Sequence, residues 1–240
     1  MASLMKTSVR RVSATLALGA LTFGVMSHAH ALSAPAAHLT RAPLEQYLMA
    51  NPAGEIALAR SAAPAAISSQ AEVLTLGAQG YQIAVKGHNG FVCLVLRGWT
   101  GDFNDPDFWN PKVRAPICYN AVAARSVLLN DLRRTGWALA GVSRTEMINR
   151  TRAAIASHVI VPPPAGAMSY MMSRNGYLSD RDGHWHPHLM FFLPRMPPAE
   201  WGANAPGGVV MGDADDFEPV TVFFIPLPHW SDGTPAPGDM

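Results

Sequence analysis

The sequence predicts an α+β fold in which an antiparallel β-sheet meander carries two or three helices packed on one face, in a single domain. Three β-rich runs separated by glycine-containing turns lie between residues 72 and 96. Helix-capping residues and apolar residues at helical spacing follow between residues 120 and 157. Hydrophobic residues make up 49% of the 240-residue chain and charged residues 15%, which excludes a disordered, highly charged protein.

The first 31 residues have the pattern of a secretory signal peptide: a basic start, an uncharged apolar stretch and an Ala-x-Ala end. The basic residues are Lys6, Arg10 and Arg11, and the apolar stretch covers residues 12–26. A membrane anchor needs about 20 strongly apolar residues, so an uncleaved anchor is the weaker alternative. We therefore expect cleavage after Ala31 and export to the periplasm or the medium.

Cleavage would also change the charge of the chain. Removing three cations from the 18 Lys+Arg leaves 15 against 17 Asp+Glu, a net charge of −2. Nucleic-acid binding requires a clustered cationic surface, so a nucleic-acid partner is not expected. No other apolar segment is long enough to span a bilayer, which predicts a soluble protein without a transmembrane segment after cleavage.

Residues 32–70 are expected to form a flexible lead-in and one short helix. Asn51 followed by Pro52 is typical of a helix start, and good helix formers extend from Glu55 to Ala63. The β-rich runs come next, and the Asn89-Gly90 dipeptide between the second and third favours a hairpin. These runs cover residues 73–76, 81–86 and 91–96.

Two further helices are predicted. The first covers residues 120–134 and ends at Gly136, with Asp131 outside its apolar stripe. The second extends from Arg144 to about Ser157, because Ser143 and Glu146 form a capping box.

The final third of the chain predicts short strands and a tail. Ten of the 20 prolines lie between Pro187 and Pro237, so long regular central strands are not expected there. We place one domain at residues 71–228 and a Pro/Gly-rich tail at 229–240. The candidate strands are residues 167–172, 189–193, 209–211 and 220–225.

Cys93 and Cys118 are the two cysteines of the chain. An oxidising compartment favours a disulfide between them, and the alternative is a nucleophilic thiol beside a histidine.

The densest group of metal-ligating side chains is His184, His186 and His188, with Asp182 beside them. In an extended segment the three imidazoles point to one side, and two of them could reach one zinc or copper ion. The alternative is an aromatic-rich loop whose histidines bind backbone groups. Candidates for a further ligand are Asp180, Asp182 and His158.

Two acidic clusters could hold calcium, although neither has the EF-hand spacing and solvated loops are the simpler interpretation. One cluster is Asp102, Asn104, Asp105 and Asp107, and the other is Asp213, Asp215, Asp216 and Glu218.

No nucleophile elbow, P-loop, dinucleotide fingerprint or His-Glu-x-x-His motif is present in the sequence. The first functional hypothesis is therefore an exported domain that binds a small ligand or a protein partner. The alternative is a metal-dependent hydrolase, or a periplasmic metal-handling protein, that uses the His184, His186 and His188 cluster.

Overall fold

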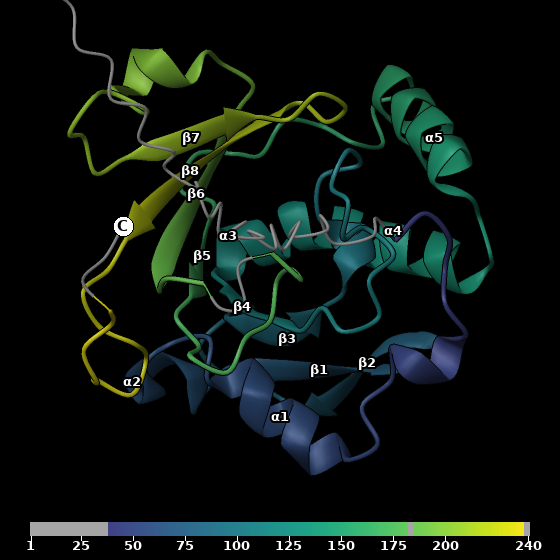
Figure 1. Ribbon diagram of the computed structural model, residues 1–240, viewed down its shortest axis with the longest axis horizontal. Helices are drawn as coiled ribbons and strands as arrows, with labels where there is room; N and C mark the ends of the chain where they lie inside the picture. The colour runs from purple at the N-terminus through teal and green to yellow at the C-terminus, as the bar shows by residue number, and fades with distance from the viewer. Residues whose placement is uncertain (1–37, 182–184, 238–240) are drawn as a thin grey trace, which may run out of the picture. The chain divides into compact units, whose positions relative to one another are not determined.

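An eight-stranded sheet lies at the centre of the described part of the chain, residues 38–181 and 185–237 of the computed structural model (Figure 1). The strand order is β2-β1-β3-β4-β5-β6-β8-β7. The predicted signal peptide lies outside the described residues. The strands are β1 (Glu72–Gly77), β2 (Gly80–Val85), β3 (Val92–Leu96), β4 (Ala115–Tyr119), β5 (Met168–Met171), β6 (His188–Pro194), β7 (Met211–Ala214) and β8 (Val220–Pro226).

The sheet is mixed, which corrects the prediction of an antiparallel meander. β3 pairs with β1 in parallel, through Glu72 with Val92 and Val73 with Cys93, whereas the other neighbouring strands are antiparallel. The connection after β2 crosses the start of β1 instead of turning back as a hairpin. Gly87 permits this crossing, because a Cβ there would lie 2.1 Å from the backbone nitrogen of Glu72.

The predicted helix starts are confirmed by their caps. The Asn51 side chain accepts a hydrogen bond from the Ala53 N–H, and the Ser143 side chain accepts one from the Glu146 N–H. Within the described residues, no helix is long and apolar enough to cross a membrane. The helices are α1 (Pro52–Arg60), α2 (Ala65–Ser68), α3 (Ala121–Ala124), α4 (Val127–Leu139) and α5 (Arg144–Ala156), and the 3-10 turns are η1 (Leu44–Gln46), η2 (Gly98–Thr100) and η3 (Pro198–Trp201).

The single helix predicted at 120–134 is two helices, and its predicted end at Gly136 is wrong. α3 and α4 are separate, and α4 continues through Gly136 to Leu139. The last turn is retained because Ala138 is completely buried in an aromatic cluster with Trp99. The chain leaves the helix just before Gly141, whose φ of 76° suits glycine.

The helices cover both faces of the sheet, where the sequence predicted one. Side chains alternate along β3, so Cys93 and Val95 pack with Ala59 of α1. Leu94 of the same strand packs on the other face, with Leu128 of α4. Figure 1 accordingly shows α1 and α4 on opposite sides of β3.

The predicted disulfide is confirmed. Cys93 of β3 and Cys118 of β4 are directly opposite each other in the antiparallel ladder and are bonded. The bond joins two central strands beneath α1, where both side chains are completely buried.

The expectation that proline would prevent long strands is wrong. β6 and β8 pair from His188 with Pro226 to Pro194 with Val220, over the full seven residues of each strand. The prolines lie at the ends of these strands, where a missing N–H costs little.

Part of the segment predicted as a tail packs on the rest of the chain. Trp230 is buried, and the Ser231 N–H donates to the Met172 carbonyl at 3.0 Å. The Ser231 hydroxyl also donates to the Ser61 carbonyl at 2.6 Å.

A buried ion pair connects α1 to the end of β3. The Arg97 guanidinium donates to Glu55 at 2.9 Å, to the Tyr47 carbonyl at 2.8 Å and also to the Val95 carbonyl. Glu55 in turn accepts the N–H of Leu76 in β1. The exposed fractions of the Arg97 and Glu55 side chains are 0% and 2%. Each charge therefore depends on the other for its compensation.

We predict that Glu55→Ala lowers the free energy of unfolding by about 3–5 kcal/mol, because it leaves the Arg97 charge buried without its partner. Urea unfolding with the disulfide intact measures this loss. The control is Arg150→Ala, which removes an exposed pair with Glu146 and should cost less than about 0.5 kcal/mol. Equal losses in the two variants would contradict the structural role of the pair.

Candidate functional site

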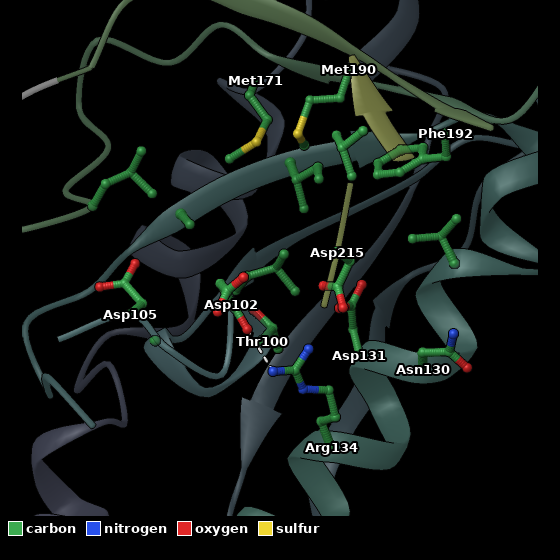
Figure 2. Close-up of a pocket in the computed structure, with 18 of the residues that line it drawn as sticks. Thr100, Asp102, Asp105, Asn130, Asp131, Arg134, Met171, Met190, Phe192 and Asp215 are labelled. Carbon is green, nitrogen blue, oxygen red and sulfur yellow. Dashed lines mark hydrogen bonds between the residues drawn. The ribbon is translucent and has the colours of Figure 1, made fainter. Parts of the chain in front are cut away.

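A cavity of about 350 Å³ is lined by six strands, β3 to β8, and by α4 (Figure 2). Alternating residues of β4, β6 and β8 face it, as the two-residue period of a β-strand requires. Its sheet side is mainly apolar, with Met171, Met190 and Phe192 in view in Figure 2. The remaining apolar lining includes Ala115, Ile117, Val220, Val222 and Phe224.

The other side of the cavity is acidic. Asp102, Asp105 and Asp107 contribute from the segment after η2, and Asp213 and Asp215 contribute from β7 and the residues that follow it. The sequence treats these as two separate clusters. The structure brings them together, and the Asn104 side chain donates to Asp216 at 3.2 Å across the junction.

Negative charge exceeds positive charge in this lining, with seven carboxyl groups against two guanidinium groups. Burial, followed by the charges of Asp102, Asp215 and Asp216, raises the pKa of the Asp213 carboxyl. Burial also raises the pKa of Glu218, although the nearby Arg134 charge opposes the shift. Burial is the main cause of both shifts, and the smaller contributions of neighbouring carboxylates to them indicate negative potential.

Both arginines of the lining already have partners. Arg97 is held by Glu55, and Arg134 forms an ion pair with Glu218 at 3.4 Å. The Arg134 guanidinium also donates to the Gly101 carbonyl and lies 3.9 Å from the centre of the Phe103 ring. Of the Arg134 nitrogens, Nε is buried and has no hydrogen-bond partner among the described residues.

Asp131 is a buried carboxyl group in the cavity wall that the sequence places outside the apolar stripe of its helix. The Tyr119 hydroxyl donates to it at 2.6 Å. Burial raises the pKa of Asp131 to about 7, Glu218 adds to the shift, and Tyr119 and Arg134 oppose it. A helical face with Leu128 one turn before Asp131 and Ala138 two turns after it could have indicated this burial.

The predicted zinc or copper site at His184, His186, His188 and Asp182 stays a prediction, because Asp182 and His184 lie outside the described residues. His188 lines the cavity between the rings of Trp185 and Phe224, and its Nδ1 lies 2.8 Å from the His186 carbonyl oxygen. Burial lowers the pKa of His188.

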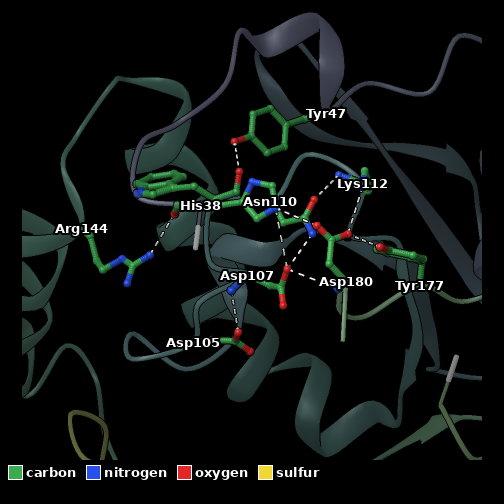
Figure 3. A network of polar contacts seen from close by, with 10 residues as sticks. His38, Tyr47, Asp105, Asp107, Asn110, Lys112, Arg144, Tyr177 and Asp180 are labelled. Carbon is green, nitrogen blue, oxygen red and sulfur yellow. Dashed lines mark hydrogen bonds and ion pairs between the residues drawn. The ribbon is translucent and has the colours of Figure 1, made fainter. Parts of the chain in front are cut away.

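A different histidine meets two carboxylates in the structure (Figure 3). The His38 Nε2 lies 3.1 Å from the Asp180 Oδ2 and 4.0 Å from the Asp107 Oδ1. The sequence assigns Asp107 to a calcium cluster and Asp180 to the His184 group. It does not single out His38, which is 142 residues from Asp180.

We predict that Asp131→Asn becomes more stable relative to wild type as the pH rises from 4 to 8. The folded-state pKa of about 7 exceeds the usual 3.8, so the stability contributed by protonation of Asp131 is full below pH 4. This contribution is lost as the pH rises through 7, and the expected relative gain is about 2–4 kcal/mol. Urea unfolding of both proteins across this range measures it. A difference that does not vary with pH would contradict the shift.

No protein-family model, no curated protein and no solved structure matches the chain. The cavity and its side chains are therefore the basis for a functional proposal.

Proposed function

We propose that the chain is an exported protein that binds a small molecule with an apolar body and a cationic group in the cavity. The observation that carries this proposal is the pairing of a largely apolar sheet side with an acidic opposite side in one cavity of about 350 Å³. That volume lies within the range of about 300–1,000 Å³ that is usual for small-molecule sites.

The two sides of the cavity would contribute differently to binding. Methionine, phenylalanine and valine side chains offer apolar area, which stabilises an apolar ligand by about 25 cal/mol per Å² removed from water. The carboxylates select for positive charge, because they outnumber the two arginines and each arginine is already paired. An anionic ligand of the same shape would meet repulsion on the acidic side.

Export is supported by the signal-peptide pattern of residues 1–31, and the Cys93–Cys118 disulfide is compatible with it. Expression of the whole chain in a bacterium with a periplasm, followed by mass spectrometry of the purified protein, tests the proposal. Cleavage after Ala31 and recovery from the periplasm are expected. Cytoplasmic protein that retains residues 1–31 would contradict export.

We predict that octylammonium binds more tightly than octanol, and octanoate more weakly than either, in isothermal titration calorimetry. The three probes share one alkyl chain, so their order reports the charge preference of the cavity. The preference for the ammonium over the carboxylate should be about fivefold or more. It should decrease in 1 M salt, where the Debye length is about 3 Å.

Two matched variants test whether the probes occupy this cavity. Val222→Phe adds volume to the cavity wall and should weaken all three probes, whereas Val209→Phe, at an exposed site outside the cavity, should not. Asp215→Asn should weaken octylammonium more than octanol. Equal affinity for octanoate and octylammonium, or binding unchanged by Val222→Phe, would exclude the proposed function.

A further inference from the structure

We propose that His38, Asp107 and Asp180 form a binding site for a divalent transition-metal ion of the Zn²⁺ class. This site is distinct from the predicted histidine cluster at 184–188, and it does not rest on the proposed cavity ligand. Three segments that are distant in the sequence meet there: the residues before η1, the acidic segment after η2 and the residues after Tyr177.

The distances between the three side chains suit a small cation. One ligand atom from each lies within 4.8 Å of the others, and the His38 ring faces both carboxylates in Figure 3. In tetrahedral zinc, metal–ligand distances of about 2.0–2.1 Å place neighbouring ligand atoms roughly 3.3 Å apart. The His38–Asp180 and His38–Asp107 separations of 3.1 and 4.0 Å bracket this value, and the two carboxylate oxygens lie within 4.8 Å of each other. A contraction of the two carboxylates around the ion would complete the three-ligand set.

Surrounding groups hold each ligand in place. The backbone N–H of His38 donates to the Pro106 carbonyl at 3.0 Å, which holds the histidine beside the acidic segment. The Asn110 side chain donates to Asp107 Oδ1 at 2.7 Å, the oxygen that faces His38 and that keeps a second lone pair for an ion. The Tyr177 hydroxyl donates to Asp180. Such outer hydrogen bonds orient carboxylates for metal binding.

The charge balance also favours a cation. Two carboxylates face His38, and Lys112 is the cation that pairs with them, through the Asp180 Oδ1 at 3.1 Å. The Lys112 side chain is 64% exposed, so it can move away with little cost. The other oxygen, Oδ2, is the one that faces His38. Tyr177 bonds to Oδ1, so an ion held by Oδ2 would leave that hydrogen bond intact.

The donor set indicates the class of ion. One imidazole and two carboxylates combine the nitrogen ligand of zinc and iron with the oxygen ligands of harder cations. Three protein ligands leave the fourth position of tetrahedral zinc for water or another molecule. Asp107 also lines the cavity, so an ion at this site would lie beside the cavity wall.

Isothermal titration calorimetry of the metal-free mature protein with ZnCl₂ tests the proposal. His38→Ala and Asp180→Asn should each weaken zinc binding by at least about tenfold. His88→Ala, at an exposed histidine elsewhere, should leave binding unchanged. Lys112→Met should tighten it about two- to fivefold, because a competing cation is removed.

Two further measurements distinguish this site from zinc binding at the histidine cluster. The double variant His184→Ala/His186→Ala should retain zinc, and Co²⁺ should give the intense visible absorption of a tetrahedral site in wild type but not in His38→Ala. Circular dichroism verifies that each variant is folded. Zinc binding unchanged in folded His38→Ala, or an equal loss in the His184→Ala/His186→Ala variant, would overturn the proposal.

Discussion

The buried Glu55–Arg97 pair is the interaction on which the rest of the structure depends. Arg97 follows β3 directly, and its guanidinium holds α1, the Tyr47 carbonyl and the end of β3 together. The acidic segment begins a few residues later, so its starting position is set by this pair. Both candidate sites use that segment, and both therefore depend on this charge pair, of which Arg97 also lines the cavity.

The face of the sheet that packs against α4 determines the chemistry of the cavity. Alternating strand residues provide an apolar wall, and α4 places Asp131 against it. In this setting burial, more than any neighbouring charge, determines the protonation of the carboxyl group. The acidic side has a different origin, since it consists of loop carboxylates that accumulate where two distant segments meet. The cavity thus combines low polarity and negative potential.

The two candidate sites share Asp107, which lines the cavity and also faces His38. Both sites favour positive charge, one through an excess of carboxylates and the other through a geometry suited to a small ion. A metal ion bound beside the wall would reduce the negative potential that an organic cation experiences, because charges this close interact even in salt. Occupancy of the two sites is thus expected to be linked.

The sequence by itself determined the features that depend on neighbouring residues and on composition. The caps at Asn51 and Ser143, most of the strands and the Cys93–Cys118 pair were predictable, because they follow from local hydrogen bonding, from β-rich runs and from cysteine number. The central strand β4 was not predicted. Only the tertiary structure decided the parallel pairing of β1 and β3, the joining of the two acidic clusters in one cavity and the meeting of His38 with Asp180. These depend on which surfaces pack together over long stretches of chain, and no local pattern encodes that choice.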